Sequence, residues 1–490
     1  MGFKDEVEKL IADKKVDEIK KIKNKFLERD IYKDLVDWKN TDDSVLFLRG
    51  PRQVGKTYLL KKLGSENFKK VVYVDLTLKK EGNKFLEIYK KFVESGEFGS
   101  NDKDKRLLWL GVFMEYDKEF TDSEDTLIII DEIQESSSIF NSIREFNRNL
   151  NCMVAVTGSY LGVAQFRNDF RVSAGDYTVY ELNSLSYVEF LKATGIYEKY
   201  KGIKEIEKNK LTVEEMEICK EVENYYDIYT QIGGYPEVVK NYLRNKNIDK
   251  CKEIVGKLLE FFFEESKAYF SDIIESTLFK KTLVLTIQDL VSRTNNLQKQ
   301  DKFITFRENI NESKIRKEEK IRCLNWLLTG NILGSCYVYN ELNKLTITDV
   351  EKYYFKDIGM LNYLCETIGT VQKSDIDGVR AENFVYLYLN NNVKVIGKSR
   401  GISKDTSVNS YCNKNKNVEI DFILNTYNDK KVALEVKSSK GKTTSSETEL
   451  SDGDLDCIIK LVKMYGGIQE NKITVPIFMV DKLKEILDKI

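Results

Sequence analysis

Short apolar runs alternate with amphipathic or polar segments through the first part of the chain. The runs are rich in β-branched and aromatic residues, which is typical of buried strands. Apolar residues at helical spacing follow two of them, in KTYLLKKLG (56–64) and LSYVEFLKATG (185–195), and Gly64 is a candidate C-cap for the first helix. Strands that alternate with helices predict a parallel sheet covered on both faces. The five strand candidates are SVLFLRG (44–50), VVYVDL (71–76), TLIIID (126–131), CMVAVTG (152–158) and YTVYEL (177–182).

The rest of the chain reads first as helices and then as a mixture of strands and helices. Helical, charged segments are interrupted by QIGGYPEVVKNYL around Pro236 and are followed by a strand at SCYVYN (335–340). Helices followed by a strand or hairpin fit a winged helix, and a plain helical connector fits equally well. Further along, we expect a Ser/Thr/Gly-rich loop at 438–454, a helix at 457–467 and a strand at 473–481.

The strand candidate at 44–50 leads into GPRQVGKT, which satisfies the phosphate-loop pattern GxxxxGK[ST]. Gly50 and Gly55 let backbone amides turn toward a phosphate, and the next helix points its positive end at the anion. Lys56 would reach the β- and γ-phosphate oxygens, and the Thr57 hydroxyl would bind Mg²⁺. A chance match in a loop is the alternative, but a strand before and a helix after are the context that this motif requires. Nucleotide contacts are therefore expected from Gly50, Pro51, Arg52, Gln53, Val54, Gly55, Lys56, Thr57 and Tyr58.

A second acidic element follows about 75 residues later, where the apolar run TLIIIDEIQ ends in Asp131 and Glu132. Asp131 would hold the Mg²⁺ shell, and Glu132 would orient and deprotonate the attacking water. Alternatively, these carboxylates simply begin a helix, where negative charge is favourable. Together with the phosphate loop, the catalytic interpretation is favoured, and the adjacent carboxylate favours hydrolysis over transfer to a metabolite.

Other polar residues are weaker candidates for the same site. Thr157 and Ser159, at the end of another strand, could contact the γ-phosphate or the water, or could cap a helix. Arg52, Arg167 and Arg171 could stabilise charge in the transition state, and for each of them an ordinary surface position is the alternative.

A second group of polar residues lies in the last third of the chain: Glu382, Asp421, Glu435 and Lys437. Alternation along a strand places Glu435 and Lys437 on one face, and the spacing from Asp421 suits a hairpin. We expect Glu382 to open the helix AENFVYLYL. This constellation resembles the PD-(D/E)xK nuclease fold, in which the acidic groups (here Asp421 and Glu435) gather Mg²⁺ and the lysine assists the water. Chance Glu-x-Lys matches and simple ion pairing are the alternatives in a chain so rich in both residues.

The overall composition excludes several classes of catalytic and metal site. The chain has 490 residues, 78 basic and 79 acidic, so its net charge gives no support for a global nucleic-acid field. It has no histidine, which excludes Ser-His-Asp triads and histidine-containing metal sites. Its eight cysteines form no CxxC pair, so we expect free thiols in the cytoplasm. No apolar run is long enough to span a membrane.

The front half resembles the AAA-type ATP-binding proteins, close to the STAND and archaeal ATPase branch, through LRGPRQVGKTYLL, IIIDEIQ, VTGSYLG, LSYVEFL and GGYPEVV. The resemblance implies that Gly234, Tyr235 and Pro236 lie against the nucleotide, whereas a plain turn is the alternative. One departure is that Asp176 follows Gly175 where many relatives have a Gly-Arg pair. Arginine assistance would then have to come from elsewhere. Asp357, in KYYFKDIGMLNYL, also matches the family, and we expect it to be structural.

The resemblance and the pattern together predict a multidomain α/β protein. Its expected parts are N-terminal helices (1–40), a P-loop core (41–190), a helical lid (191–250), a helical or winged-helix segment (251–345) and a restriction-endonuclease-like domain (346–490).

We therefore expect an ATPase that uses Mg²⁺ and carries a nuclease-like domain directed at nucleic acid. The alternative is a nucleotide-dependent switch whose C-terminal domain binds DNA or protein without cleaving it. DNA and a second copy of the chain are the candidate partners, and no membrane is expected.

Overall fold

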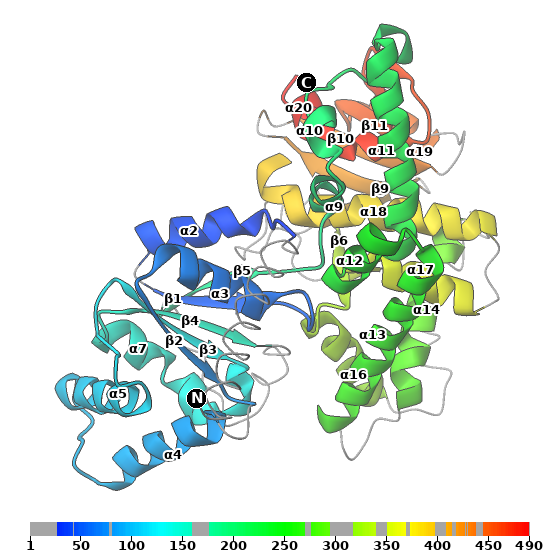
Figure 1. The fold of residues 1–490 in the computed structure, drawn as a ribbon. Helices are drawn as coiled ribbons and strands as arrows, with labels where there is room; N and C mark the ends of the chain where they lie inside the picture. The colour runs from blue at the N-terminus through cyan, green and yellow to red at the C-terminus, as the bar shows by residue number, and fades with distance from the viewer. Residues whose placement is uncertain are drawn as a thin grey trace.

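The fold is described from a computed structural model of the chain. It describes residues 27–42, 44–77, 81–158, 176–269, 276–294, 317–339, 350–368, 373–396, 408–413, 418–426, 428, 430–437 and 444–489. Two lobes are visible, one built around each of two sheets (Figure 1). A single stretch of chain after the first sheet joins them.

The first lobe is built on a five-stranded parallel sheet of order β2-β3-β4-β1-β5. Its strands are the five that the sequence predicts: β1 (Val45–Arg49), β2 (Lys70–Asp75), β3 (Thr126–Asp131), β4 (Met153–Gly158) and β5 (Tyr177–Glu181). The helices are α2 (Ile31–Thr41), α3 (Lys56–Asn67), α4 (Glu81–Glu94), α5 (Asp102–Tyr116), α6 (Ser137–Asn141) and α7 (Ile143–Asn149), with the 3-10 turn η1 (Ile133–Glu135).

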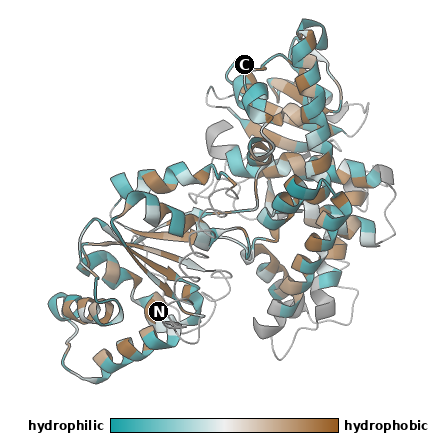
Figure 2. Cartoon of the chain, viewed as in Figure 1, coloured by the Kyte–Doolittle hydropathy of each residue, from teal (hydrophilic) through white to brown (hydrophobic). Residues whose placement is uncertain are grey.

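Successive side chains of each strand point to opposite faces of this sheet, and apolar side chains on both faces explain why helices cover both. On β1, Leu46 and Leu48 pack with residues of α2 and α3, whereas Val45 and Phe47 pack with residues of α5 and α7. Figure 2 shows the resulting brown, apolar strands between helices whose outer faces are teal. All carboxyl ends of the parallel strands meet at one edge, where ligands of such sheets bind.

The predicted C-cap at Gly64 is wrong, because α3 continues to Asn67 and Phe68 is its C-cap. A Cβ on Gly64 would lie 2.8 Å from a methyl of Val71, so the glycine permits close packing of α3 on β2 rather than ending the helix. A glycine inside a helix and one after its end look alike in sequence.

The second lobe combines helices with an eight-stranded mixed sheet of order β12-β13-β11-β10-β9-β8-β6-β7. The strands are β6 (Leu333–Val338), β7 (Val350–Phe355), β8 (Val408–Asn413), β9 (Val418–Asn425), β10 (Lys431–Lys437), β11 (Cys457–Val462), β12 (Gly467–Gln469) and β13 (Lys472–Pro476). The α-helices are α9 (Tyr187–Thr194), α10 (Tyr197–Tyr200), α11 (Val213–Ile232), α12 (Pro236–Asn245), α13 (Ile248–Tyr269), α14 (Ser276–Thr294), α16 (Lys317–Thr329), α17 (Ile358–Ile368), α18 (Lys373–Ile396), α19 (Thr444–Ser451) and α20 (Leu483–Leu487). The 3-10 turns are η2 (Lys208–Lys210) and η3 (Ile477–Lys482).

Several predictions for this lobe are wrong. The stretch predicted as a helix at 457–467 is strand β11, and the predicted loop at 438–454 contains α19. The strand predicted at 473–481 ends at Pro476 and continues as η3. Because alternating residues of β11 pack in two different core clusters, both of its faces are buried, and such a continuous apolar run resembles a helix in sequence.

The winged-helix prediction stays a prediction. Helices α14 and α16 precede the antiparallel pair β6–β7, which is the expected element order. However, β6 also pairs with β8, so this hairpin forms part of the eight-stranded sheet.

The helices that follow the first sheet pack on the C-terminal half of the chain, as Figure 1 shows for α9, α10 and α11. Tyr200 donates a hydrogen bond of 2.8 Å to Asp481, and Lys482 donates one of 3.0 Å to the carbonyl of Lys201. The segment expected to act as a lid is therefore joined to the second lobe. Its role as a lid stays a prediction.

Seven cysteines are buried and none of these seven forms a disulfide, in keeping with the prediction of free thiols: Cys152, Cys219, Cys251, Cys323, Cys336, Cys365 and Cys457. In the described part of the chain, no helix has the length and apolar character needed to cross a membrane.

Candidate functional site

The phosphate loop follows β1, and its backbone has a shape that most residues disfavour. Gly55 has a φ of 98°, and Gln53 lies in the left-handed region with a φ of 64°. A Cβ on Gly50 would lie 2.0 Å from the carbonyl oxygen of Leu182. The glycines of the motif are therefore required, one by conformation and one by the close approach of the chain that follows β5.

Lys56 lies over this loop. Its ammonium donates hydrogen bonds of 2.9 Å to the carbonyl of Gly50 and 2.8 Å to that of Pro51, and the residue is buried. The loop carbonyls thus hold the charge of the first residue of α3 where an anion in the loop would meet it.

The two predicted magnesium ligands meet at the edge of the sheet. The hydroxyl of Thr57 donates a hydrogen bond of 2.7 Å to Asp131, and the hydroxyl of Tyr73 donates one of 2.9 Å to the same carboxylate oxygen. Burial raises the pKa of Asp131, and the hydrogen bonds from Thr57 and Tyr73 oppose the rise. A hydroxyl and a carboxylate side by side form an oxygen donor set that fits Mg²⁺.

Glu132 follows Asp131 in a strained conformation, with φ 53° and ψ 47°. Its own amide donates a hydrogen bond of 2.9 Å to Asp131, and the side-chain amide of Gln134 donates one of 2.5 Å to its carboxylate. The left-handed backbone and Gln134 together fix the direction of the carboxylate. The sequence interpretation did not assign Gln134, although it stands two residues after the proposed base.

Thr157 has a structural partner. Its buried hydroxyl donates a hydrogen bond of 2.7 Å to the carbonyl of Leu48 on the neighbouring strand β1. Ser159, Arg167 and Arg171, the other weak candidates, lie outside the described residues. The guanidinium of Arg52 lies 5.8 Å from the ring centre of Phe261 on α13, so the phosphate loop reaches the second lobe.

Asp176, which stands where the resemblance led us to expect an arginine, faces two arginines of α7. Its carboxylate lies 3.5 Å from the guanidinium of Arg148 and 3.8 Å from that of Arg144. Asp176 is therefore held in an ion-pair cluster at the start of β5.

The GGYP turn, between α11 and α12, contacts both the chain that leaves the first sheet and the start of α17. The amide of Gly234 donates a hydrogen bond of 2.9 Å to Asp357, and its carbonyl accepts one of 2.7 Å from the amide of Leu185. Asp357 also accepts from the amides of Gly359 and, more weakly, Met360 at the start of α17. Burial raises the pKa of Asp357, and these amides oppose the rise. The expected structural role of Asp357 agrees with these contacts.

Pro236 begins α12 directly after this turn, in the first-turn position that suits a proline. Its expected contact with a nucleotide, and those of Gly234 and Tyr235, stay predictions.

Three of the four predicted nuclease-like residues come together on β9 and β10. These strands are antiparallel neighbours, and the amide of Val436 donates a hydrogen bond of 2.8 Å to Asp421. The ammonium of Lys437 lies 2.9 Å from Glu435 and 3.5 Å from Asp421. The predicted hairpin geometry for Asp421 and Glu435 is thus present in the structure.

The charged groups of this cluster shift one another's pKa values. Burial, followed by the charge of Asp421, raises the pKa of Glu435, while Lys437 opposes the rise. Burial disfavours the ammonium of Lys437, but Asp421 and Glu435 hold its pKa above the usual value. Ser446 on α19 donates a hydrogen bond to Glu435. No sequence pattern singled out Ser446, because its segment reads as a loop.

Glu382 departs from the prediction. It lies within α18 rather than at its start, and it is buried in an ion pair of 3.0 Å with Lys352. Tyr354 also donates a hydrogen bond to it, and Lys352 lies 3.3 Å from Glu419. Its negative charge contributes to the raised pKa of Lys437. Glu382 therefore neighbours the cluster, with its carboxylate held by partners of its own.

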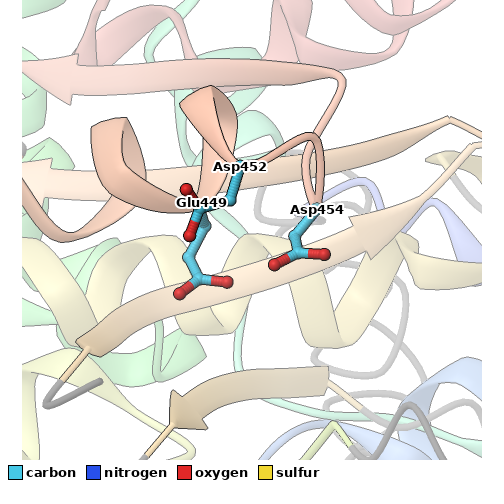
Figure 3. A group of neighbouring side chains, drawn as sticks. All are labelled: Glu449, Asp452 and Asp454. Carbon is cyan, nitrogen blue, oxygen red and sulfur yellow. The ribbon is translucent and has the colours of Figure 1, made fainter.

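A separate group of carboxylates comprises Glu449, Asp452 and Asp454 at the end of α19 (Figure 3). Their oxygens lie within 4.8 Å of one another. The amide of Asp454 donates to the carbonyl of Glu449, so the turn that ends the helix brings them together.

Comparison with protein families matches two separate parts of the chain. Residues 42–191 match an AAA domain, and residues 223–370 match a domain of unknown function (DUF8612). The first match supports a P-loop ATPase of the AAA type for the first lobe. No curated protein matches the chain.

Solved structures with similar folds are distant. A Walker-type ATPase of Pyrococcus abyssi shares 13% identity at a TM-score of 0.41, over 69% of this chain and 96% of that one. Cdc6p of Pyrobaculum aerophilum shares 12% identity at 0.24, over 63% and 89%. The RuvB Holliday junction branch migration motor of Thermotoga maritima shares 12% at 0.26, over 63% and 90%. These scores are too low to establish a common overall arrangement.

Proposed function

We propose that the protein binds and hydrolyses ATP with Mg²⁺ at the phosphate loop, and that the reaction controls a nuclease-like domain acting on nucleic acid. The single observation that carries the ATPase proposal is the meeting of Thr57 and Asp131 beside the Lys56 ammonium. Lysine, hydroxyl and carboxylate from two distant segments supply the three functions that a Mg²⁺-nucleotide site needs.

Each residue of this site has a distinct task. The amides of the loop and Lys56 would bind the phosphates, and Thr57 with Asp131 would hold Mg²⁺, which neutralises charge on the phosphate oxygens when bound. Glu132 would accept the proton of the attacking water, and Gln134 would keep its carboxylate pointed at that water. In the absence of histidine, a carboxylate is the natural base here.

The nuclease-like proposal rests on Asp421, Glu435 and Lys437. Two carboxylates on adjacent strands can share one divalent cation, and the neighbouring ammonium can stabilise charge on a phosphodiester. Ser446 would orient Glu435 through its hydrogen bond. Asp421 and Lys437 are partly exposed, so a ligand can approach them from the surface.

A second candidate function is a nucleotide-dependent switch whose C-terminal domain binds DNA or protein without cleaving it. The environment of Glu382 favours this alternative. A carboxylate already neutralised by the buried Lys352 is poorly placed to gather a metal ion beside a substrate.

The test is phosphate release from ATP by the full chain, with and without duplex and single-stranded DNA, over a series of Mg²⁺ concentrations. Mg²⁺-dependent release that DNA stimulates, together with cleavage of the DNA, supports the first proposal. Turnover with DNA binding but no cleavage selects the switch. A chain that neither binds nor hydrolyses ATP refutes both.

A further inference from the structure

Arg29, just before α2, makes three contacts that none of the motifs predicts. Its guanidinium donates hydrogen bonds of 2.9 Å to the carbonyl of Val54 and 2.6 Å to the carbonyl of Asn183. The third donor, Nε, lies 3.2 Å from the carboxylate of Glu189. Arg29 is 9% exposed, so these contacts are made away from bulk water. A planar fork with several fixed donors suits such a junction, and a lysine could not reproduce it.

The contact with Val54 acts on the phosphate loop itself. Val54 and Gly55 share one peptide unit, which is planar and trans, so its carbonyl and its N–H point in opposite directions. By drawing the carbonyl of Val54 toward itself, Arg29 turns the N–H of Gly55 the other way. The left-handed backbone of Gly55 makes this orientation possible.

The other two contacts act on the stretch of chain between the lobes, residues 182–186, which we call the connector. Asn183 lies within it. Glu189 binds the last residue of the connector, because its carboxylate accepts a hydrogen bond of 2.8 Å from the amide of Ser186. The same carboxylate accepts one of 2.7 Å from the amide of Asp30. On its other side the connector is held to the GGYP turn through the amide of Leu185.

We propose that Arg29 is a positioning residue for the ATPase reaction, which orients the Gly55 amide for the phosphates and links the state of the loop to the connector. This inference rests on the proposed ATPase function. Nucleotide in the loop would tighten the Val54–Arg29 contact, and Asn183 and Glu189 would carry that change to the start of α9. The contacts of Arg29 would therefore respond to the phosphate groups of the nucleotide and not to its base.

A purely structural role is the competing explanation. Buried ion pairs such as Arg29–Glu189 can do no more than satisfy one another, and breaking one destabilises a fold whether or not it transmits anything. The two roles differ in their response to nucleotide. A structural pair protects the connector equally with and without nucleotide, whereas a positioning residue makes that protection nucleotide-dependent.

The experiment compares wild type, Arg29→Lys and the surface control Arg148→Lys in the full chain. Affinity for Mg·ADP and Mg·ATP is measured by titration calorimetry, and hydrogen exchange of residues 182–189 is followed with and without Mg·ADP. For Arg29→Lys we expect about tenfold weaker binding, the size of one lost charge-assisted hydrogen bond, and loss of the nucleotide-dependent protection. Arg148→Lys should match wild type in both.

The inference is overturned if Arg29→Lys binds nucleotide as tightly as wild type and its connector is still protected by nucleotide. It is also overturned if Arg29→Lys is only less stable to heat, with nucleotide affinity and nucleotide-dependent protection unchanged. If Arg29→Lys fails to fold, Glu189→Gln tests the inference instead. This variant keeps the contact between Arg29 and Val54, so nucleotide affinity should stay at the wild-type value. The nucleotide-dependent protection of the connector against hydrogen exchange should weaken. An unchanged connector response there also refutes the inference. Failure of the proposed function is separate, because wild type itself would then bind no nucleotide.

Discussion

The hydroxyl of Thr57 donates a hydrogen bond of 2.7 Å to the carboxylate of Asp131, although 74 residues separate them in the chain. One begins the helix after β1 and the other ends β3, and β4 lies between those strands. The parallel sheet brings their carboxyl ends to one edge, and this relationship turns two local motifs into one site.

Lys56→Ala should abolish detectable nucleotide binding. The substitution removes the ammonium that the loop carbonyls of Gly50 and Pro51 hold over the phosphate position. We expect ATP affinity to fall by at least about a hundredfold, in line with the loss of a desolvated phosphate contact. Calorimetric titration tests this, with Lys62→Ala on the same helix as the control. Retained affinity would contradict the phosphate-loop assignment.

Glu132→Gln should bind ATP but hydrolyse it about 10²–10⁴-fold more slowly, which is the usual contribution of a general base. The isosteric amide preserves the hydrogen bond with Gln134 in shape but cannot take a proton. Single-turnover assays with radiolabelled ATP measure the step, and the exposed Glu135→Gln serves as the control. Normal turnover in Glu132→Gln would mean that another group is the base.

Asp131→Asn should stabilise the nucleotide-free protein at neutral pH while removing Mg²⁺-dependent turnover. Burial raises the pKa of Asp131, so the folded state binds this proton more tightly than the unfolded state does. The contribution of Asp131 to stability therefore falls as pH rises above about 4, the ordinary carboxyl value. Asparagine carries no charge and escapes that loss.

Thermal melts at a series of pH values check this prediction. We expect the melting temperature of Asp131→Asn to exceed that of wild type by on the order of 2 °C at neutral pH, and the gap to close near pH 4. A gap of constant size across the series would show that the charge of Asp131 is not its cause.

Glu435→Ala and Lys437→Ala should each abolish DNA cleavage while leaving ATP turnover intact, because their site lies on the second sheet. Ser446→Ala should keep cleavage but move its pH profile upward, since the hydrogen bond from Ser446 lowers the pKa of Glu435. Plasmid nicking with several Mg²⁺ concentrations is the assay. The exposed pair Glu447 and Lys472 supplies matched alanine controls. Cleavage that survives in both Glu435→Ala and Lys437→Ala would show that the nuclease assignment is wrong.

Asp357→Ala should lower the free energy of unfolding by about 3 kcal/mol, because the amides of Gly234 and Gly359 would lose their buried acceptor. Asp357→Asn keeps an acceptor oxygen and should cost less. Urea denaturation of the full chain measures both. Equal stability of wild type and Asp357→Ala would mean that the GGYP turn does not need the carboxylate that precedes α17.

The sequence by itself determined the first sheet and predicted the candidate site residues at its edge. Strand candidates bounded by glycine, and a phosphate loop between a strand and a helix, are local patterns, so they can be read without knowing the fold. The same holds for Asp421, Glu435 and Lys437, because a hairpin keeps its two strands close in sequence.

Only the tertiary structure decided which surroundings those residues have. The run at 457–462 is a strand because it pairs with a parallel neighbour on each edge and packs core residues on both faces, and Glu382 is neutralised because β7 brings Lys352 against α18. Arg29 meets Val54 after the chain has crossed β1, and it meets Glu189 only after the chain has crossed the whole first sheet. Hydrogen bonds and ion pairs depend on distance in space, and residues far apart in sequence carry no local pattern that records it.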